Sequence, residues 1–166
     1  MSLERTPAPF IHNRNSISDL PETVDWREKG IVNEIKDQAQ CGSCWSFSNV
    51  ASIEGAWAQA NGSLVSLSEQ NLMDCSYAQG NKGCSGGLID NAFSYVIKSG
   101  GLDTESSYPY TATSSKNCQF SKENVAASIS KYVDIPDRDE NALKNAVAER
   151  VVSVAIHVGD DFQHYK

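Results

Sequence analysis

The most regular pattern of apolar positions begins at Ser43 or Cys44 and ends at Asn61-Gly62. Its apolar face recurs at spacings of three and four residues, which predicts a helix. The positions on that face are Phe47, Val50, Ala51, Glu54, Trp57 and Ala58. Glu54 is the charged member of this set. It is either an edge position or a buried carboxylate with a partner, because buried charges must be paired.

Two further helices are predicted between residues 66 and 98. The first is indicated by Ser66-x-x-Glu69, the spacing of a capping box, in which two side chains satisfy each other's free backbone donors. The second extends from about Leu88 to Lys98, with Gly100-Gly101 as its stop. The inward positions expected on this helix are Ile89, Phe93, Val96 and Ile97.

The last quarter of the chain changes from helical to strand patterning. Residues from Asp139 to Glu149 predict a helix whose inward positions are Leu143, Ala146 and Val147. Residues 152–158 then alternate, which is typical of a strand with one apolar face. The apolar positions of that strand are Val152, Val154, Ile156 and Val158. We therefore expect helices first, and a strand-rich region beginning before Lys166.

Composition narrows the class of protein. The 166 residues, 40% hydrophobic and 21% charged, are enough for one domain with a sizeable core or for two small lobes. The net charge of -7 argues against a nucleic-acid partner, which needs a basic face. No apolar run is long enough to suggest a membrane span. Residues 1–19 contain Pro7 and Pro9 without apolar periodicity, so we expect a linker there.

Five cysteines in a chain of this size indicate disulfides, and the odd count leaves at least one thiol over. They are Cys41, Cys44, Cys75, Cys84 and Cys118. Cys41 and Cys44 form a C-x-x-C pair with three interpretations. A zinc site would need a second closely spaced pair, and a thioredoxin-like dithiol would follow a strand rather than a polar segment. The third interpretation makes one cysteine a nucleophile and the other structural.

The sequence around the pair decides between these interpretations. Residues 38–47 read QAQCGSCWSF and contain C-G-[SA]-C-[WY], the signature of papain and the cathepsins. Further matching landmarks follow in the same order: Val24-Asp25-Trp26-Arg27, Ser68-Glu69-Gln70, Asp74-Cys75, Gly83-Cys84-Ser85-Gly86-Gly87 and Tyr108-Pro109-Tyr110. From about Leu20 to Lys166 the chain resembles the papain-like cysteine peptidases, and within them the cathepsin L-like branch.

This resemblance implies an α+β fold with two lobes, a helical left lobe and a β-barrel right lobe, and an active site between them. Residues 20–133 would form the complete left lobe and residues 134–166 only the beginning of the barrel. Residues 1–19 would be the tail of a propeptide. The resemblance also implies disulfides Cys41–Cys84 and Cys75–Cys118, which leave Cys44 free.

The resemblance makes Cys44 the nucleophile, and its place in the first turn of a helix favours the thiolate. The side-chain amide of Gln38 and the Cys44 N–H would bind the oxyanion. Gly42, Gly86 and Gly87 match positions that lie along an extended substrate, where glycine leaves the backbone accessible. Positions matching the pocket for the second residue before the cut are Leu88, Ile89 and Ala155, which predicts a hydrophobic preference.

The family's catalytic histidine and asparagine are expected about 130–150 residues after the cysteine, which places them beyond Lys166. Of the three histidines, His12 lies in the linker and His164 in a polar turn. His157 shares a strand face with Ala155, but its position is not that of the family's histidine. We therefore expect a chain truncated before its base.

The resulting hypothesis is a thiol endopeptidase that acts through a Cys44 acyl-enzyme when completed by a C-terminal segment. The alternative is an inactive truncated homologue that serves as a binding or decoy module, and a thioredoxin-like oxidoreductase is more distant. Expected partners are peptide or protein substrates, a propeptide and cystatin-like inhibitors, in a lysosomal or secreted setting. No metal site or cofactor is suggested. Asn61-Gly62-Ser63 forms a glycosylation sequon.

Overall fold

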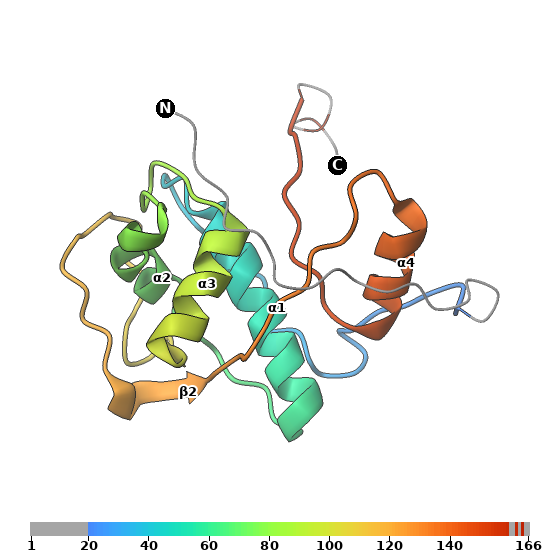
Figure 1. Ribbon diagram of the computed structural model, residues 1–166, viewed down its shortest axis with the longest axis horizontal. Coiled ribbons are helices and arrows are strands. Elements are labelled where there is room, and N and C mark those ends of the chain that lie inside the picture. Colours follow the sequence, from blue (N-terminus) through green and yellow to red (C-terminus); the bar gives the residue numbers. More distant parts are fainter. Residues whose placement is uncertain (1–19, 160–161, 163, 165–166) are drawn as a thin grey trace.

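Three helices form the centre of the computed structural model, which describes residues 20–159 together with 162 and 164. These are α1 (Cys44–Asn61), α2 (Glu69–Cys75) and α3 (Ile89–Ser99), and each packs against the other two (Figure 1). The core between them is apolar and excludes solvent; its members include Val50, Ile53, Leu67, Leu72, Met73, Ala92, Val96 and Leu102. The linker and propeptide tail expected at residues 1–19 lie outside the described residues.

The predicted helices at residues 44–61 and 88–98 are confirmed, with some differences on their faces. On α1, Val50, Glu54 and Ala58 are buried as expected, whereas Ala51 is exposed. On α3, Val96 is buried and Phe93 stacks on Tyr132, but Ile97 is exposed. The buried face of α3 instead includes Asn91, Ala92 and Tyr95. A period of 3.6 residues locates a face only within about one position, and packing against neighbouring elements decides its edges.

The start of α2 differs from the predicted capping box. Ser68, not Ser66, is the N-cap: its backbone is extended and its Oγ accepts a hydrogen bond from the Asn71 N–H at 2.9 Å. The same hydroxyl donates to the Tyr108 carbonyl at 2.6 Å, so it both accepts and donates a hydrogen bond inside the protein. Glu69 is therefore the first helical residue, and its carboxylate is directed toward Lys36 instead of back to a cap.

This correction gives a direct test. Ser68→Ala is expected to lower the free energy of unfolding by about 1–2 kcal/mol, because it removes the cap and leaves the buried Asn71 N–H without an acceptor. Ser66→Ala, at the exposed position two residues earlier, is expected to change it by less than about 0.5 kcal/mol. Urea unfolding of the two variants measures both values. Equal losses in the two variants would contradict the assignment of Ser68 as the cap.

A small sheet closes one side of the helical core. Strands β1 (Leu102–Asp103) and β2 (Val125–Ala127) pair antiparallel, with Leu102 opposite Ala127. Two single-turn 3₁₀ helices, η2 (Tyr77–Gln79) and η3 (Lys122–Asn124), lie in the connections. Disulfides join Cys41 to Cys84 and Cys75 to Cys118, the same pairs that the family resemblance implies. The first joins the loop before α1 to the connection between α2 and α3. The second joins the end of α2 to the connection that follows α3.

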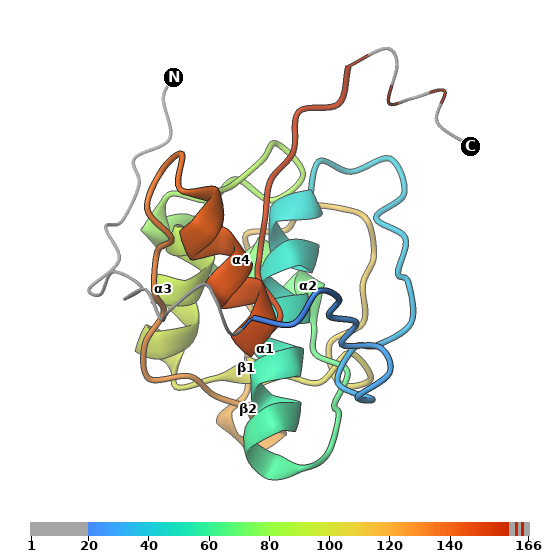
Figure 2. The ribbon, with the colours of Figure 1, turned by 90° about the vertical axis from the view of Figure 1, so that its right-hand side faces the viewer.

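Helix α4 (Glu140–Glu149) stands apart from the other three in Figure 1, and in Figure 2 it lies in front of α1. Its predicted position is confirmed, and Asp139 caps it by accepting from the Ala142 N–H at 2.9 Å. Its predicted inward face is largely wrong: Ala146 is buried, but Leu143 and Val147 are 38% and 37% exposed. Ala142, Asn145 and Ala146 are the buried residues, so α4 packs through a narrower face of small side chains.

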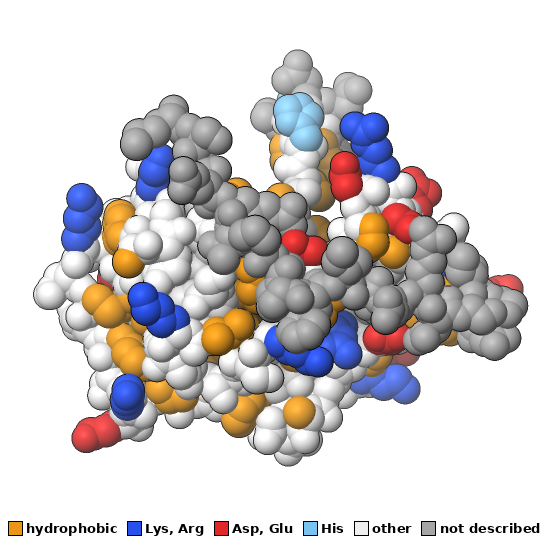
Figure 3. Space-filling model, viewed as in Figure 1, with side chains coloured by type: hydrophobic (Ala, Val, Ile, Leu, Met, Phe, Trp, Pro, Cys, Tyr) orange, Lys and Arg blue, Asp and Glu red, His pale blue; other side chains and the backbone are white. Residues whose placement is uncertain are grey.

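The strand predicted at residues 152–158 does not form with any segment that the structure describes. Residues 151–154 lie against α1 without strand pairing, and the chain beyond them projects from the body of the molecule (Figures 1 and 3). Val154, Ile156 and Val158 are 53%, 63% and 45% exposed. Side chains of α1 hold the segment: Ser48 Oγ accepts from the Val154 N–H at 3.1 Å, and Ser153 Oγ lies 2.7 Å from Ser52 Oγ. An alternating pattern fixes the facing of a strand, whereas the strand itself needs a paired neighbour.

Candidate active site

The exposed thiol of Cys44 stands at the first residue of α1. The other four cysteines are in disulfides, so Cys44 is the free thiol of the chain. The N-cap residue Ser43 makes no side-chain cap bond, and the first turn carries no acidic residue. Free N–H groups at a helix start attract negative charge, and nothing in the first turn competes with a thiolate for them.

A second polar group lies on the loop before Cys44. The Gln38 side-chain amide donates to the Cys41 carbonyl at 2.7 Å, which directs it along the segment that leads to Cys44. One of its two N–H bonds remains for another acceptor. The backbone carbonyl of Gln38 in turn accepts from the Tyr110 hydroxyl at 2.7 Å. The structure therefore brings Gln38 and Cys44, the two predicted catalytic residues, onto one short and well-tethered segment.

Tyr110 is the residue that sequence reasoning missed. Its hydroxyl donates to Gln38 and lies 2.6 Å from Ser43 Oγ, so Ser43 donates to it. Its ring meets the Phe47 ring edge-to-face with 4.9 Å between centroids. One side chain thus joins the Gln38 loop to the first turn of α1. The Tyr108-Pro109-Tyr110 landmark was visible in the sequence, but a contact across 72 residues has no local signal.

The three predicted substrate-binding glycines differ in what they contact. Gly42 pairs with the loop that carries Cys84, its N–H donating to the Cys84 carbonyl at 3.0 Å. A Cβ at Gly42 would lie 2.5 Å from that carbonyl oxygen, so glycine is required for this approach. Gly86 has a φ of +101° and nothing within 4 Å of such a Cβ, so its surface is open. Gly87 has no room for a side chain, because a Cβ there would lie 2.6 Å from the Trp45 ring.

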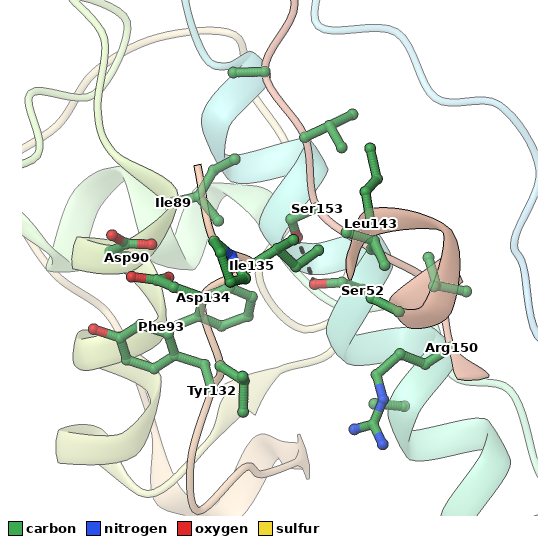
Figure 4. Close-up of a pocket in the computed structure, with 18 of the residues that line it drawn as sticks. Ser52, Ile89, Asp90, Phe93, Tyr132, Asp134, Ile135, Leu143, Arg150 and Ser153 are labelled. Atoms are coloured by element: carbon green, nitrogen blue, oxygen red, sulfur yellow. Dashed lines mark hydrogen bonds between the residues drawn. The ribbon is translucent and has the colours of Figure 1, made fainter. Parts of the chain in front are cut away.

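A cavity of about 860 Å³ lies between α1, α3, α4 and the segment after α4. Of the three predicted pocket residues, Ile89 and Ala155 line it, whereas Leu88 does not. Figure 4 shows Ile89 and Phe93 of α3 facing Leu143 of α4 across this space, with Ser52 and Ser153 hydrogen-bonded at its floor. About half of its other lining side chains are apolar, among them Ile53, Ala56 and Val152, and eight others are charged. The apolar part of the lining suits an apolar ligand group.

The two histidines that the structure describes do not contact the thiol. His157 and His164 are both exposed, and neither is hydrogen-bonded to Cys44 among the described residues. His12 lies outside the described residues. In the same part of the chain no group of three His, Cys, Asp or Glu side chains could hold a metal ion. No described helix is long and apolar enough to cross a membrane.

A buried charge cluster joins α1 to the start of α2. Lys36 Nζ lies 2.8 Å from Glu69 Oε1 and 3.2 Å from Glu54 Oε1, and both carboxyl groups are nearly inaccessible to solvent. Glu54 also accepts from the Leu67 N–H at 2.9 Å, so the interpretation of Glu54 as a buried, partnered carboxylate is confirmed. One ammonium cannot neutralise two carboxylates. Burial raises the pKa of Glu69 to about 7, against the opposing effect of Lys36.

Comparison with known proteins assigns this arrangement to a family. Residues 20–166 match the family model described as papain family cysteine protease. The chain belongs to the papain family. It is 52% identical over 166 residues to the rice senescence-specific cysteine protease SAG39, covering 99% of this chain and 48% of that protein. It is 51% identical over 161 residues to a cathepsin L-like peptidase of Aedes aegypti, covering 96% and 47%.

The papain-family fold is also found in a solved structure. Digestive procathepsin L 3 of the Tenebrio molitor larval midgut aligns with a TM-score of 0.75 at 45% identity, over 87% of this chain and 47% of that one. The predicted α+β papain-like fold and the cathepsin L-like branch are thereby confirmed. The helical core with its small sheet is consistent with the left lobe of that fold and part of the right lobe. The chain spans about half the length of the papain-family relatives it matches.

Proposed function

We propose that this chain carries the nucleophile of a thiol endopeptidase that cleaves peptide bonds through an acyl-enzyme on Cys44. The observation that carries the proposal is the exposed free thiol at the start of α1, with no cap or acid in the first turn. Membership of a family of cysteine proteases supports it. The thiolate is the attacking form of cysteine, and the exposed position gives the Cys44 sulfur access to a substrate carbonyl.

In the proposed reaction the Cys44 thiolate attacks the carbonyl carbon of the scissile bond, and a sulfur–carbon bond forms. The carbonyl oxygen becomes an oxyanion, for which the free N–H of Gln38 Nε2 and the Cys44 N–H are the proposed donors. One such donor contributes roughly 3 kcal/mol to transition-state stabilisation. Collapse of the oxyanion breaks the carbon–nitrogen bond, and the leaving amine takes a proton from an acid. The same group then acts as a base toward the hydrolytic water, whose attack breaks the sulfur–carbon bond and frees Cys44. Since neither described histidine contacts Cys44, we propose that this group lies outside the described residues.

The proposed substrate is an extended peptide that passes Gly42 and Gly86. A hydrophobic side chain at the second residue before the cut is proposed to enter the cavity between Ile89 and Ala155. Leu88 keeps a proposed role at the entrance although it does not line the cavity. Gly87 is proposed to act indirectly, because its close approach to Trp45 sets the course of the neighbouring backbone.

Partners and location follow from the same proposal. A propeptide and cystatin-like inhibitors are proposed to occupy the substrate strip, and one similar structure is a procathepsin. Two disulfides favour an oxidising setting, lysosomal or secreted. A 50% identical relative from Arabidopsis thaliana is a KDEL-tailed cysteine endopeptidase. Such a tail is an address within the secretory pathway, which supports the setting proposed for this chain.

One observation favours a second candidate, a catalytically inactive homologue that binds peptides as a decoy. Among the described residues Cys44 has no histidine partner. A decoy would bind peptides along the same strip without cleaving them. Retention of both Gln38 and Cys44 weighs against it, because binding alone needs neither an oxyanion donor nor a free thiol.

Hydrolysis of a fluorogenic peptide with a hydrophobic second residue, at mildly acidic pH under mild reduction, tests the proposal. Hydrolysis that is lost in Cys44→Ala would support the endopeptidase. Alkylation of Cys44 by a peptidyl reagent, measured against iodoacetamide, reports substrate binding in the same sample. Peptide-enhanced alkylation without hydrolysis would favour the decoy. Hydrolysis that persists in Cys44→Ala would refute the proposed nucleophile.

A further inference from the structure

The far end of α1 carries a sequence motif that the proposed peptidase chemistry does not use. Asn61-Gly62-Ser63 is an N-glycosylation sequon, and no other asparagine of the chain is followed by serine or threonine at that spacing. Such triplets also arise by chance, so the motif alone decides nothing. Its local structure is what distinguishes it.

All three residues of the sequon are exposed. Asn61 is the last residue of α1, and Gly62 ends the helix with a φ of +73°, its N–H donating to the Ala58 carbonyl at 2.8 Å. No atom lies within 4 Å of a Cβ built at Gly62, so the turn faces open space. The sequon therefore occupies a surface turn with room for a bulky group on both sides of Asn61.

The hydrogen bond of Asn61 is compatible with modification of the same atom. Asn61 Nδ2 donates to the Trp57 carbonyl at 3.0 Å, one turn earlier in α1. The primary amide carries two N–H bonds, and attachment of a sugar to nitrogen consumes one of them. The remaining N–H can keep the bond to Trp57, so a glycan does not have to remove a contact of the fold.

We propose that Asn61 is an N-glycosylation site. The glycan comes from a lipid-linked oligosaccharide pyrophosphate, and a membrane glycosyltransferase performs the transfer. The Asn61 amide nitrogen bonds to the first carbon of the sugar, the bond from that carbon to the pyrophosphate oxygen breaks, and the lipid pyrophosphate leaves. One amide proton passes to a base. The two disulfides indicate folding in an oxidising compartment, where this donor is available.

The position of Asn61 determines what the glycan can and cannot affect. Asn61 and Cys44 are the two ends of the 18-residue α1, so they are about 26 Å apart along the helix axis at a rise of about 1.5 Å per residue. In Figure 1 the Asn61 end of α1 is at the bottom of the molecule, opposite the end of the helix that begins with Cys44. A glycan here shields the lower end of the helix and leaves Cys44 accessible.

The full chain, expressed behind a secretory signal in eukaryotic cells, tests the proposal. The native chain is expected to lose one glycan on treatment with peptide N-glycosidase, and the enzyme is expected to leave aspartate at position 61 in the peptide map. Asn61→Gln and Ser63→Ala are expected to remove the glycan, whereas Ser63→Thr keeps the sequon and is expected to retain it. Ser63→Ala leaves Asn61 intact, so a folding defect of the asparagine variant cannot mimic the result.

Two results would overturn the inference. A secreted native chain with both disulfides formed but with unmodified Asn61 in the peptide map would show that the turn is not a site. A glycan that persists in Ser63→Ala would place the modification elsewhere. The rate of Cys44 alkylation by iodoacetamide is expected to be unchanged after enzymatic removal of the glycan. A changed rate would contradict the remote placement. None of these measurements depends on peptidase activity, so they stand apart from the proposed function.

Discussion

Replacement of Lys36 by methionine is expected to lower the free energy of unfolding by about 3–5 kcal/mol at neutral pH, the usual cost of removing one partner from a buried ion pair. Lys36 supplies the ammonium that both Glu54 and Glu69 contact. Methionine keeps much of the side-chain volume but leaves two buried carboxyl groups without a cation. It also removes the bond from Lys36 to the Leu67 carbonyl.

The loss in the Lys36 variant is expected to depend on pH. Burial raises the pKa of Glu69, so this carboxyl is neutral at acidic pH, and a neutral buried acid costs far less than a buried charge. Urea unfolding at pH 7 and pH 4.5 measures both values, and Lys29→Met at an exposed position serves as the matched control. A loss in Lys36→Met no larger than that of the control would show that the cluster contributes little.

The native protein itself is expected to be more stable in mildly acidic solution than at neutral pH. Burial raises the pKa of Glu69 from 4.5 to about 7, and a carboxyl whose pKa is raised by folding holds its proton more tightly in the native state. The resulting stabilisation is fully present below pH 4.5 and is lost as the pH rises through about 7. The difference corresponds to about 3 kcal/mol.

Geometry agrees with a protonated Glu69 under acidic conditions. Its Oε1 accepts from Lys36, while its Oε2 is buried without a partner among the described residues and is available to carry the proton. Glu69→Gln, which imitates the neutral acid, is expected to flatten the dependence of unfolding free energy on pH between 4.5 and 7. Glu123→Gln at an exposed position should leave that dependence as it is. An unchanged slope in Glu69→Gln would assign the dependence to another group.

The local sequence pattern was sufficient to place the helices α1, α3 and α4 along the chain, because each combines repeating apolar positions with a clear glycine stop or polar cap. It did not locate every buried residue on their faces. It failed at the start of α2, where Ser66 fitted the capping-box spacing but Ser68 has the buried partner, Tyr108, forty residues away. It failed again at residues 152–158, because alternation specifies which side chains face together and not whether a neighbouring strand is present.

In the candidate site, too, residues in a local motif could be predicted and residues that act through distant contacts could not. Cys44 and Gln38 were found through a contiguous motif. Tyr110 and Lys36 were not assigned roles, since each acts on residues that are distant in sequence, Gln38 in one case and Glu69 in the other. Only folding brings these groups together. Leu88 illustrates the converse limit, because a matching position in the sequence did not place its side chain on the cavity.

The two disulfides interleave along the chain, since Cys75 lies between Cys41 and Cys84 while Cys84 lies between Cys75 and Cys118. A single cut at any peptide bond between Cys41 and Cys118 therefore leaves the two pieces covalently joined. Such a nicked molecule migrates as one band without reductant and as two with it. A protein that works among peptidases can in this way be cleaved within its helical core and still keep that core assembled.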